Sequence, residues 1–96
     1  MPDPYRLELS PAALRDLKRL PRDVQKRIVL DHLPAIARDP ILASTPLIGG
    51  LRGERSYHFG RKPEYRIIFY VEGNLVTVTI IGSRENIYKR AKRRRK

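Results

Sequence analysis

Two arginines and a tyrosine in the second half of the chain have the types and the spacing of a phosphate-binding site. Arg66 is the second residue of the stretch YRIIFYV, and Arg84 and Tyr88 lie four residues apart in GSRENIYKR. An arginine on a strand presents a rigid fork of donors that fits phosphate oxygens better than a lysine does. The alternatives are an Arg66 that simply reaches into water, and a Tyr88 that anchors a helix with Arg84 as its cation–π neighbour.

The net charge makes a polyanion the first partner to consider. Lysine and arginine number 21 against 10 acidic residues, which gives a formal net charge of +11. Seven of the last eight residues, 89–96, are basic, so the rest of the chain carries +4 (11 minus 7). This basic tail is either a solvated segment or a binding element for nucleic acid or an acidic protein.

The remaining composition excludes several kinds of site. The chain has no cysteine, which excludes disulfides, thiolate metal sites and a cysteine nucleophile, and two histidines cannot alone fill a structural zinc site. We therefore expect no metal and no other cofactor. No apolar run approaches the roughly 20 residues of a membrane span, and the start lacks the charge order of a signal peptide. We expect one domain, residues 1–96, in the cytoplasm and with no membrane partner.

The start of the chain predicts a strand that leads into a helix. Tyr5–Leu9 alternates apolar and charged residues with the period of a half-buried strand. Ser10 followed by Pro11 is typical of a helix N-cap, and we expect this first helix to end near Leu20.

A second helix completes a predicted helical hairpin. It should begin near Arg22 and end before Pro40, with a kink or a restart at Pro34, because proline removes a backbone donor. The residues that follow, 41–53, contain proline and three glycines without a sustained period, and they predict a connecting loop.

Aromatic and β-branched residues predict three further strands, at 54–59, 65–71 and 75–81. Gly82 should end the last strand, and Ser83 should cap a final helix. The expected order is β-α-α-β-β-β(-α), an α+β fold in which an antiparallel sheet carries the helical hairpin on one face. Arg66 alternates onto the other face, which we expect to be open.

The final helix would place four residues on two neighbouring faces. Arg84 and Tyr88 would share one of these faces, since four residues make about one turn. Ile87 and Ala91 would share the other and pack on the sheet.

Several motifs together resemble the RelE/ParE superfamily of toxins from type II toxin–antitoxin systems. They are the opening YRLELSPAALRDLKRLP, then IARDP, PLIGGLRG, YRIIFYV and the closing IGSRENIY, in matching order over nearly the whole chain. RelE-type members are ribosome-dependent endoribonucleases that cut messenger RNA. ParE-type members inhibit DNA gyrase through protein contacts.

The resemblance implies a catalytic site on Arg66, Arg84 and Tyr88. The best-known RelE-type members also carry a pair of lysines in the second strand, where this chain has SYHFGRK. His58 and Arg61 therefore become catalytic candidates for proton transfer and phosphate binding, with a packed histidine and a solvated arginine as the alternatives. Further basic residues are candidates for substrate binding: Arg52, Arg55, Lys62, Lys89, Arg90 and Lys92.

RNA cleavage without a metal needs a base for the 2′-hydroxyl, charge stabilisation at phosphorus and an acid for the departing 5′-oxygen. Arginines suit the second task. The base is either Tyr88, whose hydroxyl would need neighbouring cations, or His58, because imidazoles titrate near neutral pH. No carboxylate is clearly placed on the site, and we expect His32 to be structural or exposed. Free RNA would be a poor substrate unless a ribosome positions it.

The resemblance also implies partners. They are a cognate antitoxin with an acidic, toxin-wrapping segment, and messenger RNA on the ribosome as the target. The alternative is a ParE-like toxin that inhibits gyrase by binding, without nuclease activity, which the missing lysine pair favours. A basic RNA-binding module without toxicity is a third hypothesis, suggested by the tail.

Overall fold

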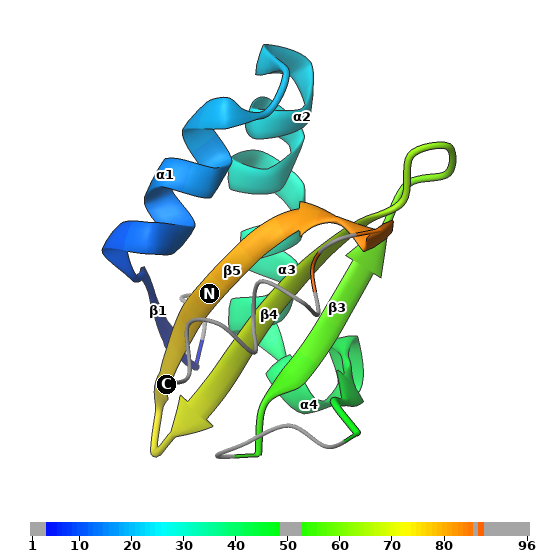
Figure 1. Cartoon of the computed structure of the whole chain (residues 1–96). Coiled ribbons are helices and arrows are strands. Elements are labelled where there is room, and N and C mark those ends of the chain that lie inside the picture. Colours follow the sequence, from blue (N-terminus) through cyan, green and yellow to red (C-terminus); the bar gives the residue numbers. More distant parts are fainter. Residues whose placement is uncertain (1–3, 49–52, 86, 88–96) are drawn as a thin grey trace.

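Figure 1 shows the computed structural model, which describes residues 4–48, 53–85 and 87. A single sheet in the order β1-β5-β4-β3-β2 organises the fold. Its strands are β1 (Arg6–Leu9), β2 (Thr45–Pro46), β3 (Arg55–Phe59), β4 (Tyr65–Glu72) and β5 (Leu75–Ser83). Helices pack on one side of this sheet, so the predicted α+β architecture is confirmed.

The sheet is mixed, whereas the sequence predicted an antiparallel one. β2, β3, β4 and β5 pair antiparallel in succession. β1 pairs with β5 in parallel, with Leu7 opposite Val76. The long connection through the helices and three strands lets the chain come back beside β1 in the same direction, which a short hairpin turn cannot do.

The helical hairpin forms where the sequence predicts it. Helix α1 (Pro11–Arg19) is capped by Ser10, whose Oγ accepts a hydrogen bond from the backbone N–H of Ala13 at 3.1 Å. The second arm consists of α2 (Arg22–Arg27), a π-helical turn η1 (Ile28–His32) and α3 (Leu33–Arg38). In the part of the chain that the structure describes, no helix is long and apolar enough to cross a membrane.

The predicted interruption at Pro34 takes the form of the π-helical turn. The backbone N–H of Leu33, just before the proline, donates to the carbonyl oxygen of Ile28, five residues earlier. Pro34 has no N–H, and its ring would crowd the carbonyl one regular turn earlier, so a wider turn relieves both problems.

Residues 41–53, expected to be a loop, contain most of one short helix and all of one short strand. Helix α4 (Pro40–Ala43) begins after Asp39, whose Oδ1 accepts a hydrogen bond from the backbone N–H of Leu42 at 3.1 Å. β2 then pairs with β3, with Thr45 opposite Ser56. A helix of four residues and a strand of two are too short to leave a periodic signal in the sequence.

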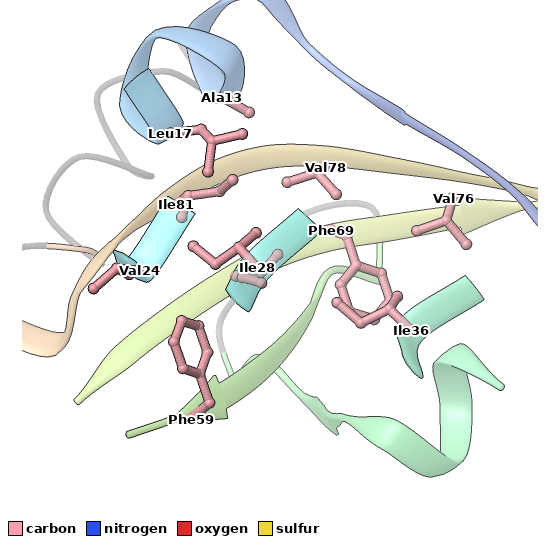
Figure 2. Close-up of a cluster of buried hydrophobic side chains, with 11 residues drawn as sticks. Ala13, Leu17, Val24, Ile28, Ile36, Phe59, Phe69, Val76, Val78 and Ile81 are labelled. Atoms are coloured by element: carbon pink, nitrogen blue, oxygen red, sulfur yellow. The ribbon is translucent and has the colours of Figure 1, made fainter. Parts of the chain in front are cut away.

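The main core lies between the helices and the sheet (Figure 2). Buried side chains from α1, α2, η1 and α3 meet those of the strands there. β4 contributes Ile67 and Phe69, both 0% exposed, with Tyr65 and Val71 partly buried beside them. The alternation along YRIIFYV therefore places these four residues as the sequence predicts.

A β-bulge at Thr79 adds one residue to β5. Ile68 of β4 pairs with Ile80, whereas the next residue, Phe69, pairs with Val78. Ile81 lies in the main core beyond the bulge, and its backbone N–H donates to Oδ2 of the buried Asp16 at 3.0 Å. Helix α1 is thereby fastened to β5 immediately after the bulge.

The sheet face that points away from the helices is partly covered, although the sequence suggested an open face. Ile68, Ile80 and Ile87 are buried there, and Leu47 packs against them. Ile87 therefore packs on the sheet as predicted, while Ala91 lies outside the described residues. The part of this face beside the small apolar cluster carries the charged groups around Arg66.

Candidate functional site

Arg66 stands in a cross-strand row on the face of β4 that points away from the helices. Its partners in the row are His58 of β3 and Gly82 of β5. Directly paired residues project from the same face of an antiparallel sheet, so His58 lies next to Arg66. Gly82 adds no side chain on the other flank. The structure thus brings together Arg66 and His58, two of the predicted catalytic residues.

The site contains a carboxylate that the sequence analysis missed. Glu64 lies two residues before Arg66, and its Oε2 accepts a hydrogen bond from Nε of that arginine at 2.8 Å and forms an ion pair with its Nη2 at 2.7 Å. The hydrogen bond from Arg66 holds the pKa of Glu64 below its ordinary value, and the charges of Arg66, Arg84 and His58 act in the same direction. The only signal in the sequence was the period-two spacing of Glu64 and Arg66.

Arg84 reaches the same site from the end of β5. Its backbone N–H donates to the carbonyl oxygen of Glu64 at 3.0 Å, and its side chain is exposed. β5 continues through Gly82 and Ser83, because both still pair with β4, so the prediction that Gly82 ends the strand is wrong. Helical residues begin at Arg84, directly after Ser83.

A pocket joins the turn between β3 and β4 to the start of this last helical segment. It is lined by Gly60, Arg61, Lys62, Pro63, Glu64, Ser83, Arg84 and Glu85. The turn depends on glycine, because Gly60 has a φ of +82° and an added Cβ would lie 3.0 Å from the carbonyl oxygen of Pro63. Arg61 and Lys62 are exposed in the turn. Three cations and two carboxylates therefore border one pocket, and the remaining net charge of +1 (3 minus 2) favours anionic ligands.

A second pocket lies against Arg66 toward β2. Its lining residues are Thr45, Pro46, Leu47, Ile48, Ser56 and Arg66. Ser56 shares the Arg66 face of the sheet, and its Oγ is buried without a hydrogen-bond partner in the described part of the chain. Arg66 is therefore accessible from two sides of the sheet face.

Arg55, a predicted substrate-binding residue, forms hydrogen bonds within the chain. Its Nε donates to Oγ of Ser44 at 2.7 Å, and its Nη2 donates to the carbonyl oxygens of Ile41 and Ser44 at 3.2 and 3.1 Å. These bonds hold α4 and the start of β2 against β3. Arg55 also projects from β3 on the opposite side to His58, because the two lie three residues apart.

Other predicted site residues lie outside the described part of the chain, so their roles stay predictions. They are Arg52, Tyr88, Lys89, Arg90 and Lys92.

His32 belongs to the helix side of the sheet, as a structural residue. Its Nδ1 lies 2.7 Å from the hydroxyl of Tyr57, and its ring stacks on Phe59 with 3.9 Å between ring centroids. Burial lowers the pKa of His32 and raises the pKa of Tyr57. Across residues 4–48, 53–85 and 87, no three histidine or carboxylate side chains cluster as a metal site requires.

Comparison with known protein families shows to which family the chain is related. The sequence profile of the ParE toxin of the type II toxin–antitoxin system parDE matches residues 7–88, which include most of β1, all of β2 to β5, and both Arg66 and Arg84. The chain belongs to this toxin family. A comparison of the toxin with curated proteins finds no match.

Solved structures show that the toxin shares its fold with RelE proteins. The RelBE2 toxin–antitoxin complex of Mycobacterium tuberculosis has a chain that is 25% identical, with a TM-score of 0.72 and coverage of 84% of the toxin and 99% of that chain. A mutant of Escherichia coli RelE in the free state is 24% identical, with a TM-score of 0.73 and coverage of 94% and 96%. A conserved hypothetical protein of Helicobacter pylori is 20% identical, with a TM-score of 0.60 and coverage of 83% and 94%.

Proposed function

We propose that this toxin is an endoribonuclease that cuts messenger RNA on the ribosome in the cytoplasm and thereby stops translation. The observation that carries the proposal is the cluster of Arg66, Arg84 and His58 around a single carboxylate. A site that already stabilises one negative charge has the donors that a phosphorane transition state requires.

The residues divide the chemistry as follows. A base takes the proton of the 2′-hydroxyl, the 2′-oxygen bonds to phosphorus, and the bond from phosphorus to the 5′-oxygen breaks as that oxygen gains a proton. Arg66 and Arg84 stabilise the charge on the non-bridging oxygens. His58, exposed beside Arg66, is the described residue suited to proton transfer. Tyr88 stays the second candidate base.

The site needs help in orienting RNA, which supports the ribosome as part of the target. Its described groups bind charge, and the pockets around them are open rather than shaped to one substrate. Holding reactants in the right geometry contributes about 7 to 11 kcal/mol to catalysis, and a messenger fixed in the ribosome supplies that geometry.

Primer extension on messenger RNA from a translating extract tests the nuclease proposal. New 5′ ends should appear when the toxin is added and should be lost in Arg66→Ala. Arg15→Ala is the matched control, because it removes the same charge from an exposed position of α1 on the helix side. Uncut messenger in cells that nevertheless stop growing would overturn the proposal.

Inhibition of DNA gyrase by binding is the second candidate. The match to the ParE family and the absence of a lysine pair in SYHFGRK favour it. A supercoiling assay with purified gyrase separates the two. If the toxin inhibits gyrase, supercoiling should fall and messenger RNA should stay uncut. Tyr88→Phe should then leave toxicity intact.

We also propose a cognate antitoxin as partner, since the RelBE2 structure is a toxin–antitoxin complex. The helical hairpin offers a suitable surface, where exposed Val29 lines a pocket with Lys18, Arg22 and Lys26, and the next residue, Leu30, is also exposed. An acidic amphipathic segment complements both its apolar and its basic parts. Its association should slow as salt rises, and a basic partner or a salt-independent rate would contradict the proposal.

A further inference from the structure

The carboxylate of Glu64 occupies the donors of Arg66 that a phosphate would use. One oxygen, Oε2, accepts a hydrogen bond from Nε at 2.8 Å and lies 2.7 Å from Nη2 in an ion pair. A phosphate that offers two oxygens to these two donors matches the planar fork better than a single oxygen does. A phosphodiester bound at this edge of Arg66 must therefore displace Glu64.

We propose that Glu64 is a specificity-determining residue that competes with ligand anions for the Nε and Nη2 edge of Arg66. Inorganic phosphate and loosely held RNA lose this competition. A phosphodiester that further contacts hold in place wins it. The inference rests on the proposed nuclease only for the identity of the anion as RNA, because the competition itself requires no cleavage.

The cations around Glu64 explain why a competing carboxylate would improve specificity. Arg61, Lys62 and Arg84 line the pocket beside Glu64, and His58 lies next to Arg66. Such a group of cations attracts any polyanion that diffuses past. The lowered pKa of Glu64 means that its carboxylate is ionised at neutral pH, so the competing charge is present under physiological conditions.

The carboxylate can leave without disturbing the main chain. The side chain of Glu64 is 29% exposed and borders the open pocket, so it can turn toward water. Its carbonyl oxygen separately accepts the backbone N–H of Arg84 at 3.0 Å. Replacement of the carboxylate by an amide therefore keeps the bond that positions Arg84, which makes Glu64→Gln a clean test.

Glu85 provides the matched control. It lines the same pocket and carries the same charge, and it is exposed. Glu64→Gln and Glu85→Gln therefore change the net charge equally. Only Glu64→Gln changes the side chain that contacts Arg66.

The experiment titrates the full chain with inorganic phosphate and with a short RNA whose reactive 2′-hydroxyl is replaced by hydrogen. The Nε–H signals of arginine, followed by NMR, report both the dissociation constant and the arginine that is bound. Glu64→Gln should tighten both ligands about fivefold, the factor for one unit charge at about 4 Å in water. Glu85→Gln should tighten them about twofold at most, and the Arg66 signal should move in Glu64→Gln before any ligand is added.

Two results would overturn the inference. Equal tightening in both variants would mean that only net charge matters, and weaker binding in Glu64→Gln would mean that Glu64 positions Arg66 for the ligand. The nuclease proposal fails separately. If the toxin cuts no messenger while Glu64→Gln alone tightens phosphate binding, the competition stands and only its RNA ligand is lost.

Discussion

The two faces of strand β4 differ in burial and in charge. Toward the helices, Ile67 and Phe69 are fully buried in the main core. Toward the other side, Arg66 is held by Glu64 with partial exposure, and only Ile68 is buried. Neighbouring residues of one strand therefore alternate between the main core and the proposed ligand site. A substitution at one position of β4 should therefore reduce stability, whereas a substitution at the next position should reduce the proposed ligand binding.

Phe69→Ala should produce the largest effect, on the helix face. Removal of a fully buried phenylalanine costs about 3 to 5 kcal/mol of unfolding free energy, a large part of the stability of a domain of this size. Urea unfolding followed by circular dichroism measures the loss. An unfolding midpoint equal to that of the unsubstituted protein would show that the helix face of β4 does not stabilise the fold through Phe69.

Arg84→Ala, on the other side of the sheet, should reduce cleavage and leave stability nearly unchanged. If the toxin is the proposed nuclease, its cleavage rate at saturating ribosome concentration should fall about 100- to 1,000-fold, or about 2.7 to 4 kcal/mol. The unfolding midpoint should stay nearly constant, because the side chain is exposed. Single-turnover rates on stalled ribosomes decide the outcome. An unchanged saturated rate would remove Arg84 from the chemistry.

His32 gives the helix face a pH dependence near neutrality. Burial lowers its pKa below 6.5, so the unfolded chain binds a proton at higher pH than the folded chain does. Its contribution to stability is therefore complete above 6.5 and declines as the pH falls toward the folded pKa. His32→Phe keeps a ring on Phe59 but cannot titrate, and it should flatten this decline in urea unfolding between about pH 8 and 5. An equally steep decline in the variant would assign the effect to other groups.

Glu64 gives the other face a smaller pH dependence in a more acidic range. The hydrogen bond from Arg66 lowers its pKa below 4.5, so its contribution is present above 4.5 and is lost as the pH falls through the folded value. The effect should be small, since water screens a pair in which both side chains are partly exposed. Glu64→Gln should remove this acid-side loss in thermal unfolding below about pH 4.5, whereas Glu85→Gln should keep it.

Local signals made much of the fold predictable. The cap at Ser10, the interruption at Pro34 and the alternation of YRIIFYV each follow from the chemistry of one or a few neighbouring residues. The parallel pairing of β1 with β5 does not, because Leu7 and Val76 meet only after the chain has folded. The short α4 and β2 depend in the same way on Arg55, whose bonds to Ser44 leave no trace in the sequence pattern.

The candidate site was predictable in its arginines and not in its carboxylate. An arginine inside an apolar strand is conspicuous, and so is one at the strand end before a helix, which drew attention to Arg66 and Arg84. Glu64 stands in GRKPE, where charged residues are usual for a turn. Its bond to Arg66, which lies beside His58 in the sheet, becomes visible only in the structure.

The bulge at Thr79 has a consequence for the comparison of related toxins. One residue can be gained or lost there while Val78 keeps Phe69 and Ile80 keeps Ile68 as partners. An alignment that runs through this point without a gap, against a relative with a regular strand, would shift every later position by one. It would then place Gly82 against the wrong column and Arg84 outside the site, so the two halves of β5 are best aligned separately.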